Sequence, residues 1–286
     1  MKLAIAVLLV ALTAVSVLGQ NEPTLRIVTE DPTLPSELFY GNIKVKPLRL
    51  RPGTNTPVTI DDNDFFVQQH YIDFLARLPE PAGFQGWMDV LNNCGKPGGV
   101  APPCDRIEVS SAFYRSEEFQ VRRYFVYRFY SVSFKRVPLY AEFIPDARRV
   151  SGFQTEQQLE ASKVAFINDF MARAEFKNKY DALNNTNFVD TLLSTAGVTL
   201  SNRQQLIDAL NATTKTRAQV LREIAESTEV YQKYFNEAFV VMQYHGYLRR
   251  DPDILYLNWI NTMNQTGDYR TMINGFVNSG EYRNRF

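Results

Sequence analysis

The feature that most constrains this chain is an internal repeat. Residues 64–91 and 238–263 align so that the same side chains recur in the same order, and one gap also superposes the only two tryptophans. A chain made of copies of one unit buries its apolar side chains between neighbouring units. The pairs that we expect to be equivalent are Phe66 and Phe239, Val67 and Val240, Tyr71 and Tyr244, Leu75 and Leu248, Arg77 and Arg250, Pro79 and Pro252, and Trp87 and Trp259.

The end of the repeated stretch recurs even more often than its beginning. Its pattern is an aromatic residue followed by Ser-x-Glu and a second large apolar residue, as at Ser116 and Glu118 and again at Ser279 and Glu281. A serine there caps a new helix, and a glutamate in the first turn favours the positive end of the helix dipole. Weaker copies end at 176 and 230. We therefore divide the chain into four units, residues 65–119, 125–176, 188–230 and 239–286.

The apolar residues of each unit recur at helical spacing, which predicts helices with one face in a core. No proline or turn cluster interrupts residues 117–134 or 228–249, so adjacent units are expected to share one long helix. The predicted fold is all-α, a helical repeat of units sharing long helices, with a short N-terminal extended or β-type arm. The Asn-rich run that ends residues 177–187 opposes helix formation and is predicted to be a hinge or domain boundary.

Outside the repeats we expect two further segments and two modules. Residues 1–19 have one lysine and an apolar run ending in Val-Leu-Gly, typical of a secretory signal peptide, although a retained anchor helix is the alternative. Residues 20–60 form the arm, in which residues 42–51 alternate apolar and basic side chains like an edge strand. Residues 61–176 and 188–286 are the two helical modules, of two units each. After signal cleavage no integral membrane span is expected, and the protein is predicted to be secreted, periplasmic or extracellular.

The two cysteines lie close together in a loop rich in proline and glycine. In an oxidising compartment, Cys94 and Cys104 are expected to form one local disulfide. A metal site is the sharper alternative, but no histidine or third cysteine lies near them in the sequence.

The titratable residues point to structural rather than catalytic roles. There are 31 basic and 31 acidic residues, so no net charge attracts nucleic acid. His70 lies on a helical stripe where unit four has Gln243, which indicates a buried hydrogen-bonding position. Paired acids such as Glu117 and Glu118 fall at repeated cap positions. We predict no catalytic, cofactor or metal residues. We also expect an arginine and a glutamate of one unit to pair in three units: Arg77 with Glu118, Arg136 with Glu175, and Arg250 with Glu281.

These residues resemble a known family. The Phe-Val…Tyr…Arg-x-Pro pattern followed by Phe-x-x-Ser-x-Glu-Phe/Tyr, over about residues 60–286, resembles the bacterial domain-of-unknown-function family numbered forty-two fourteen, which is distantly similar to the phycobilisome linker domain. The resemblance implies a helical module of exported bacterial surface proteins with no established catalytic residues. The cysteine loop and the segment 138–166 depart from its compact form.

The function predicted from these observations is a secreted, non-catalytic structural or interaction module at the bacterial cell surface or in an extracellular assembly. Its partner would be an unknown protein or a surface polysaccharide. A carbohydrate-binding module is the alternative, because tyrosine and phenylalanine rings can stack on sugars. A glycosidase-type hydrolase with two carboxylates is the third hypothesis.

Overall fold

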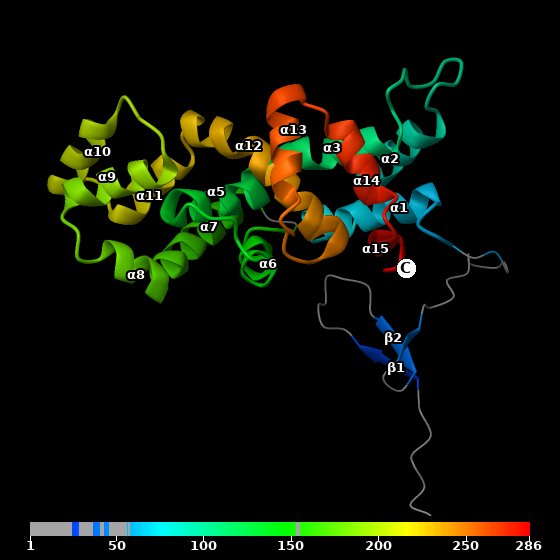
Figure 1. Ribbon diagram of the computed structural model, residues 1–286, viewed down its shortest axis with the longest axis horizontal. Helices are drawn as coiled ribbons and strands as arrows, with labels where there is room; N and C mark the ends of the chain where they lie inside the picture. Colours follow the sequence, from blue (N-terminus) through cyan, green and yellow to red (C-terminus); the bar gives the residue numbers. More distant parts are fainter. Residues whose placement is uncertain (1–24, 29–36, 41–42, 46–55, 57, 153–154) are drawn as a thin grey trace, which may run out of the picture.

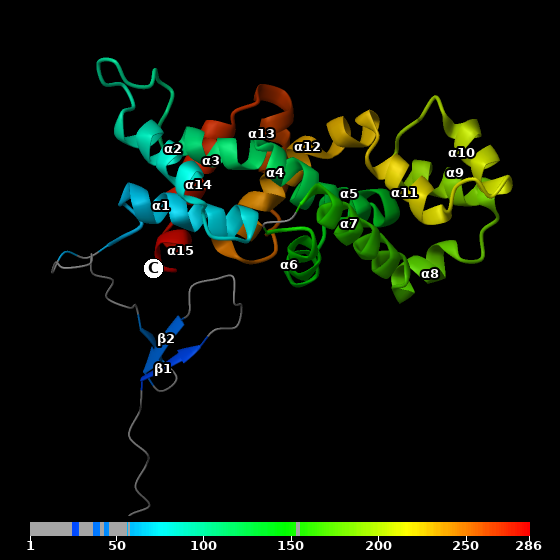
Figure 2. The same ribbon diagram turned by 180° about the vertical axis from the view of Figure 1, so that it is seen from behind.

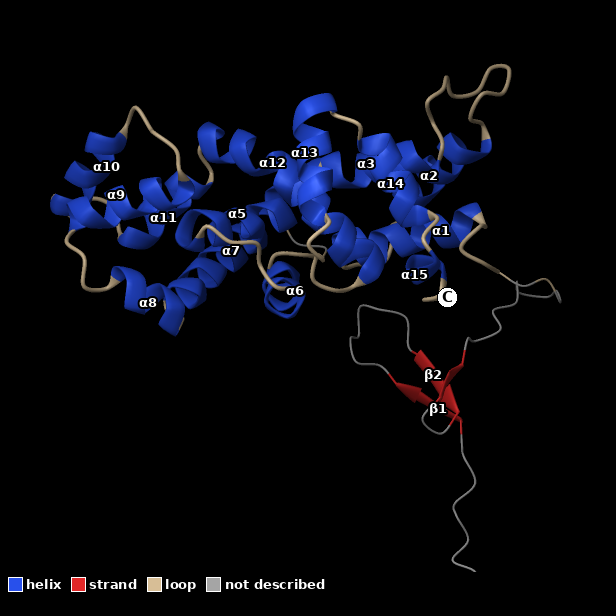
Figure 3. Cartoon of the chain, viewed as in Figure 1, coloured by secondary structure: helices blue, strands red, loops and turns tan. Residues whose placement is uncertain are grey.

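The computed structural model describes residues 25–28, 37–40, 43–45, 56, 58–152 and 155–286. The described part is predominantly α-helical, which confirms the predicted class (Figure 3). The predicted signal peptide lies outside the described residues, as do the basic residues 46–51 of the expected edge strand. None of the described helices is both long and apolar enough to cross a membrane.

The arm contains a small antiparallel sheet in the order β1-β2-β3. Strand β1 (Leu25–Val28) pairs with β2 (Glu37–Tyr40), with Leu25 opposite Tyr40. Strand β3 (Ile43–Val45) pairs with the other side of β2, so it is an edge of the sheet. Figures 1 and 2 show this sheet outside the helical body.

Each of the four units is built from three main helices in the same order. In unit one the first helix continues from α-helical into π-helical geometry, and the same happens in unit four. The main helices are α1 (Asn63–His70) with η1 (Tyr71–Leu75), α2 (Pro81–Asn92) and α3 (Arg106–Arg115); α5 (Phe125–Phe134), α6 (Tyr140–Arg149) and α7 (Glu156–Met171); α9 (Asn185–Ala196), α10 (Arg203–Asn211) and α11 (Arg217–Ala225); and α12 (Thr228–Gln243) with η3 (Tyr244–Leu248), α13 (Tyr256–Thr266) and α14 (Tyr269–Val277).

Neighbouring units share helices at two of the three junctions. Segments α4 (Glu117–Phe119), η2 (Gln120–Tyr124) and α5 form one uninterrupted helix from unit one into unit two. Helix α12 with η3 likewise carries unit three into unit four, so both predicted shared helices are confirmed. At the second junction α8 (Ala174–Tyr180) stops before α9 begins, and α15 (Gly280–Arg283) ends the described helices.

The Asn-rich run at the second junction is a helix start. The Asn184 side chain accepts a hydrogen bond from the Asn187 amide at 2.8 Å, so residues 185–187, which we expected to oppose a helix, form the first turn of α9. Asparagine caps well because its side chain satisfies an amide that has no partner within the helix.

The units pack in pairs rather than in simple sequence order. Helix α3 of unit one packs on α14 of unit four, and η1 packs on η3. Helix α5 of unit two packs on α9 of unit three, and α7 packs on α11. The two pairs occupy opposite ends of the elongated helical body (Figures 1 and 2). One apolar cluster runs through both, from Ile60 to Tyr282, so packing crosses the boundary at which we divided the modules. That division stays a prediction.

Units one and four approach closest at Gly246. A Cβ added there would lie 2.7 Å from a ring carbon of Phe74, and real Cβ atoms do not come that close. We expect Gly246→Ala to cost about 1–3 kcal/mol of unfolding free energy, because the two segments must separate or Phe74 must leave its rotamer. The matched control is Gly275→Ala in α14, which meets nothing within 4 Å and is expected to stabilise by about 0.5–1 kcal/mol. Urea unfolding measures both, and equal effects of the two variants would contradict this packing.

Candidate functional site

The repeated residues form the same cluster in three units, which we call the clamp. In each, an arginine just after the first helix makes two hydrogen bonds to the glutamate of the Ser-x-Glu motif and lies over a tyrosine ring. In unit one these are Arg77, Glu118 and Tyr71, with N–O distances of 2.8 and 2.6 Å and 4.8 Å from the guanidinium carbon to the ring centre. The pairing predicted from the sequence is present in this geometry.

Units two and four repeat the clamp closely. Arg136 bonds Glu175 at 3.2 and 2.8 Å, and Arg250 bonds Glu281 at 2.6 and 3.0 Å. A second carboxylate from the following turn joins each arginine. The complete sets are Tyr71, Arg77, Glu80 and Glu118; Tyr130, Arg136, Glu142 and Glu175; and Tyr244, Arg250, Asp253 and Glu281.

The serines and tyrosines take equivalent structural roles. Ser116 accepts a hydrogen bond from the Phe119 amide at 3.2 Å, and Ser279 accepts one from Tyr282 at 3.1 Å, so both cap the next helix as predicted. The Tyr71 ring meets Phe113 edge-on at 4.9 Å. Tyr244 meets Phe276 in the same way, also at 4.9 Å.

The tryptophans and prolines also keep their places in the repeat. Trp87 in α2 and Trp259 in α13 are both partly buried against the core, and Trp87 stacks on Phe113. Pro79 and Pro252 stand in the turn that each clamp arginine precedes. Every residue that we selected for the repeat motif therefore lies at an equivalent structural position.

The clamp supports a turn whose backbone conformation is unfavourable for a residue that has a Cβ. The residue before each clamp arginine is left-handed, with φ of 54° at Ala76, 54° at Lys135 and 53° at Arg249. Such a conformation costs roughly 1–2 kcal/mol for a residue with a Cβ. In unit three the equivalent residue is Gly197, with φ of 61°, and Val198 replaces the arginine. Glycine adopts this conformation without cost, so unit three needs no clamp.

We expect Arg77→Met to destabilise the protein by about 2 kcal/mol, because it leaves the half-buried Glu118 without its partner and releases the turn at Ala76. The Arg77 side chain is only 9% exposed, whereas that of Arg250 is 37% exposed. Arg250→Met is therefore the matched control and is expected to cost about 1 kcal/mol or less, as surface ion pairs do. Denaturant unfolding checks both; a larger loss for Arg250→Met would contradict the role of burial.

A second basic residue acts in each unit and was not predicted from the sequence. It bonds carbonyl oxygens at the end of the unit's first helix, where backbone acceptors lack partners. The bonds run from Arg123 to the Asp73 carbonyl, from Lys179 to Ser133, from Lys233 to Gly197, and from Arg285 to Gly246 and Tyr247, with N–O distances of 2.6–2.9 Å. These residues share a spacing that is visible in the sequence: each lies six or seven positions after the N-cap position of a Ser-x-Glu motif or its variant.

A buried charge centre joins units one and four. The Asp73 carboxylate accepts hydrogen bonds from Arg285 at 2.8 Å and Arg249 at 3.1 Å, while Arg123 bonds its backbone. Burial alone would raise the pKa of Asp73, but Arg285 and Arg249 outweigh it, and the pKa lies below its ordinary value. Three guanidinium groups thus surround one carboxylate, and Asp73 supplies their nearest negative charge.

Both histidines are buried. The His70 Nδ1 lies 2.9 Å from the Phe66 carbonyl, so it donates, and Nε2 accepts from the Tyr247 hydroxyl at 2.9 Å. Burial lowers the pKa of His70 to about 4. Gln243 makes the equivalent bond to the Phe239 carbonyl, as expected if histidine and glutamine fill the same role. His245 packs on Phe143, and burial lowers its pKa to about 3.

Three of the acids at the repeated cap and turn positions make structural contacts, whereas Glu117 is exposed. Glu118 and Asp253 belong to clamps, and Asp251 accepts a hydrogen bond from the Tyr140 amide. Burial raises the pKa of Glu237, which accepts a hydrogen bond from the Tyr127 hydroxyl at 2.8 Å. This arrangement offers one unusual acid where a glycosidase needs two facing each other.

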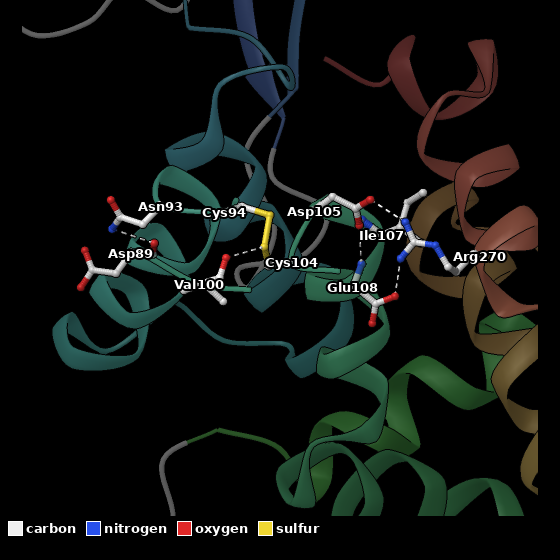
Figure 4. Close-up of a disulfide and its surroundings, with 9 residues drawn as sticks. All are labelled: Asp89, Asn93, Cys94, Val100, Cys104, Asp105, Ile107, Glu108 and Arg270. Atoms are coloured by element: carbon white, nitrogen blue, oxygen red, sulfur yellow. Dashed lines mark hydrogen bonds and ion pairs between the residues drawn. A yellow bond between two sulfur atoms is a disulfide. The ribbon is translucent and has the colours of Figure 1, made fainter. Parts of the chain in front are cut away.

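The disulfide between Cys94 and Cys104 is present, and it closes the loop between α2 and α3 (Figure 4). Asp105, the next residue, caps α3 by accepting from the Ile107 and Glu108 amides at 3.1 Å. Arg270 of unit four bonds both Asp105 and Glu108. The loop is thus anchored beside the junction of units one and four. In the described chain, no group of three or more His, Cys, Asp or Glu is placed to hold a metal ion.

Two pockets adjoin helix starts that carry the glutamate of a Ser-x-Glu motif, one in unit one and one in unit three. The first, about 600 Å³, is lined by residues that include Arg77, Glu118 and Arg122. The second, about 630 Å³, lies between the turn at Ser201 and the helix start at Glu229. The turn contributes Leu200, Ser201 and Asn202 to the second pocket and no arginine.

Comparison with known proteins identified no relative of this chain. No family model matches the chain, and the searches of curated proteins and of solved structures returned no match.

Proposed function

We propose that this protein is a secreted, non-catalytic interaction module of the bacterial cell surface or of an extracellular assembly. The observation that carries the proposal is a group of exposed aliphatic side chains around the start of α13. Ile254 is 75% exposed, Leu255 58% and Leu257 48%. Exposed apolar residues that lie together often mark a protein–protein contact surface.

The chemistry of the repeated residues supports the same proposal. The clamp arginines and glutamates bond each other, and both histidines are buried with lowered pKa values. The clamp residues and His70 are hydrogen-bonded within the chain, and His245 is packed against the Tyr140 and Phe143 rings, which favours a structural role over turnover of a substrate. Membership of the family numbered forty-two fourteen, with its bacterial surface setting, forms part of the proposal, as do the signal peptide and export.

The alternative functions have less support. Sugar-binding modules present rows of exposed aromatic rings, but the exposed large hydrophobic residues of the described chain are aliphatic. The hydrolase hypothesis would require two facing acids, whereas Glu237, whose pKa burial raises, bonds the Tyr127 hydroxyl.

Capture from the native envelope fraction tests the proposal. Full-length protein and the double variant Ile254→Asp, Leu257→Asp are immobilised, and the retained proteins are quantified by mass spectrometry. We expect a specific set of proteins to be lost at least fivefold with the double variant. Val164→Asp is the control, because Val164 is 49% exposed but lies in unit two. Equal retention by wild type and double variant would contradict the proposed surface.

A further inference from the structure

Unit three differs from the other units in one chemical respect. It keeps the glutamate of the clamp, Glu229, but has no arginine to pair with it. Among the described residues, no hydrogen bond or ion pair engages the Glu229 carboxylate, which is exposed. In the three other units the equivalent carboxylate binds a guanidinium through two hydrogen bonds.

A pocket lies beside Glu229. The pocket of about 630 Å³ is bounded by Ser201 and Asn202 from the turn and by Ser227 and Glu229 from the helix start. Ser201 stands three residues after Val198, as Glu80 stands three after Arg77 and Asp253 three after Arg250. The pocket therefore lies between the turn that follows Val198 and the helix start that carries Glu229, and its volume is ample for one arginine side chain.

The charge of the pocket favours a cation. Glu223 and Glu226 line it together with Glu229, while Arg222 is the basic residue of the lining. Arg222 already bonds Glu226 at 2.7 Å and Glu160 at 2.8 Å, and Glu223 bonds Lys215. Glu229 is thus left as an unneutralised acceptor whose two oxygens match the fork of a guanidinium.

We propose that unit three binds an arginine side chain of a partner protein, which completes the clamp from outside the chain. This inference rests on the proposed interaction function and specifies the chemistry of one contact. Arginine is expected rather than lysine, because the planar guanidinium bonds both carboxylate oxygens at once and a lysine ammonium does not. The turn at Gly197 keeps its shape without an internal arginine, so the open space costs the fold nothing.

The test is a titration of the full-length protein with the peptide acetyl-Gly-Gly-Arg-Gly-Gly-amide, followed by NMR shifts of the backbone amides. We expect shifts at residues 200–202 and 226–229. Replacing the arginine of the peptide by lysine, or by its neutral isostere citrulline, should weaken binding at least fivefold. Raising the salt concentration should weaken it as well, because the contact is an exposed ion pair.

Protein variants distinguish binding of the peptide at this site from nonspecific electrostatic attraction between the peptide and the protein. Glu229→Gln and Val198→Arg should each weaken binding at least fivefold, the first by removing the acceptor and the second by supplying an arginine of the chain itself to Glu229. Asp208→Asn removes an exposed charge on α10 outside the pocket and should leave binding unchanged. Absence of shifts in these two segments, or equal binding by Glu229→Gln and wild type, would overturn the inference.

The two proposals fail in different ways. If the arginine peptide does not bind but the envelope proteins are still lost with the α13 double variant, only the arginine site is refuted. If the peptide binds as expected while capture is indifferent to Ile254 and Leu257, the apolar surface is refuted and the arginine site stands.

Discussion

Replacing Asp73 by asparagine is expected to destabilise the protein by about 3–5 kcal/mol, more than any substitution in the clamps. The carboxylate is buried and bonds Arg285 and Arg249, while Arg123 lies against its backbone. Asparagine keeps the shape and removes the charge, so buried guanidinium groups lose their counter-ion. The expected loss of unfolding free energy exceeds what the ion pair itself contributes, because it includes the cost of keeping an unpaired charge away from water.

Two controls isolate the charge at Asp73. Asp208→Asn makes the same chemical change at an exposed position of α10 and should alter stability by no more than about 0.5 kcal/mol. Combining Asp73→Leu with Arg285→Met removes both charges of the closest pair and should cost less than Asp73→Asn alone. Guanidinium or urea unfolding measures all three, and an Asp73→Asn loss below about 1 kcal/mol would show that this centre is not a stabilising one.

As the pH is lowered, the protein is expected to unfold at a higher pH than protonation of its carboxylates alone would predict. The pKa of His70 is lowered by burial to about 4 and that of His245 to about 3, from an ordinary value of about 6.5. Between pH 6.5 and these values the unfolded chain binds protons that the folded chain does not. Stability is therefore complete above about pH 6.5 and falls as the pH drops towards 4 and 3, by on the order of 3 kcal/mol per histidine.

His70→Gln tests this pH dependence, because Gln243 already fills the equivalent position with the same backbone bond. The variant should flatten the loss of stability between pH 6.5 and 4 by about half, with the rest due to His245. Carboxylates with lowered pKa values, such as Asp73, lose their contribution only at more acid pH. Unfolding free energies at half-unit pH intervals give the answer; parallel pH profiles for variant and wild type would refute it.

The local architecture could be predicted because its signals are local. Ser116 and Glu118 indicate a cap within four residues, and the Arg-x-Pro of units one, two and four marks the end of the first helix. Since the same signals recur, the equivalence of units one and four and the pairing of Arg77 with Glu118 also followed. The turn that the clamp supports could not be foreseen, because nothing in Ala76 itself favours a left-handed conformation.

The charge centre was missed because its members belong to distant units. Arg285 lies 212 residues from Asp73, and no periodicity relates them. One signal was present: Asp73 interrupts an apolar helical stripe, at a position where unit four has Gly246. An acidic residue on such a stripe needs a buried partner, but the partner follows only from the packing of η1 on η3. The pairing of unit one with unit four was likewise invisible in the order of the chain.

A double-mutant cycle that builds the clamp in unit three tests most directly whether the four units are equivalent. If they are, the glutamate of unit three lacks only its arginine. Val198→Arg should then be more favourable by about 0.5–1 kcal/mol in the presence of Glu229 than in a Glu229→Gln background, as urea unfolding measures it. The same effect of Val198→Arg in both backgrounds would contradict the equivalence of the four units and the open arginine site in the third.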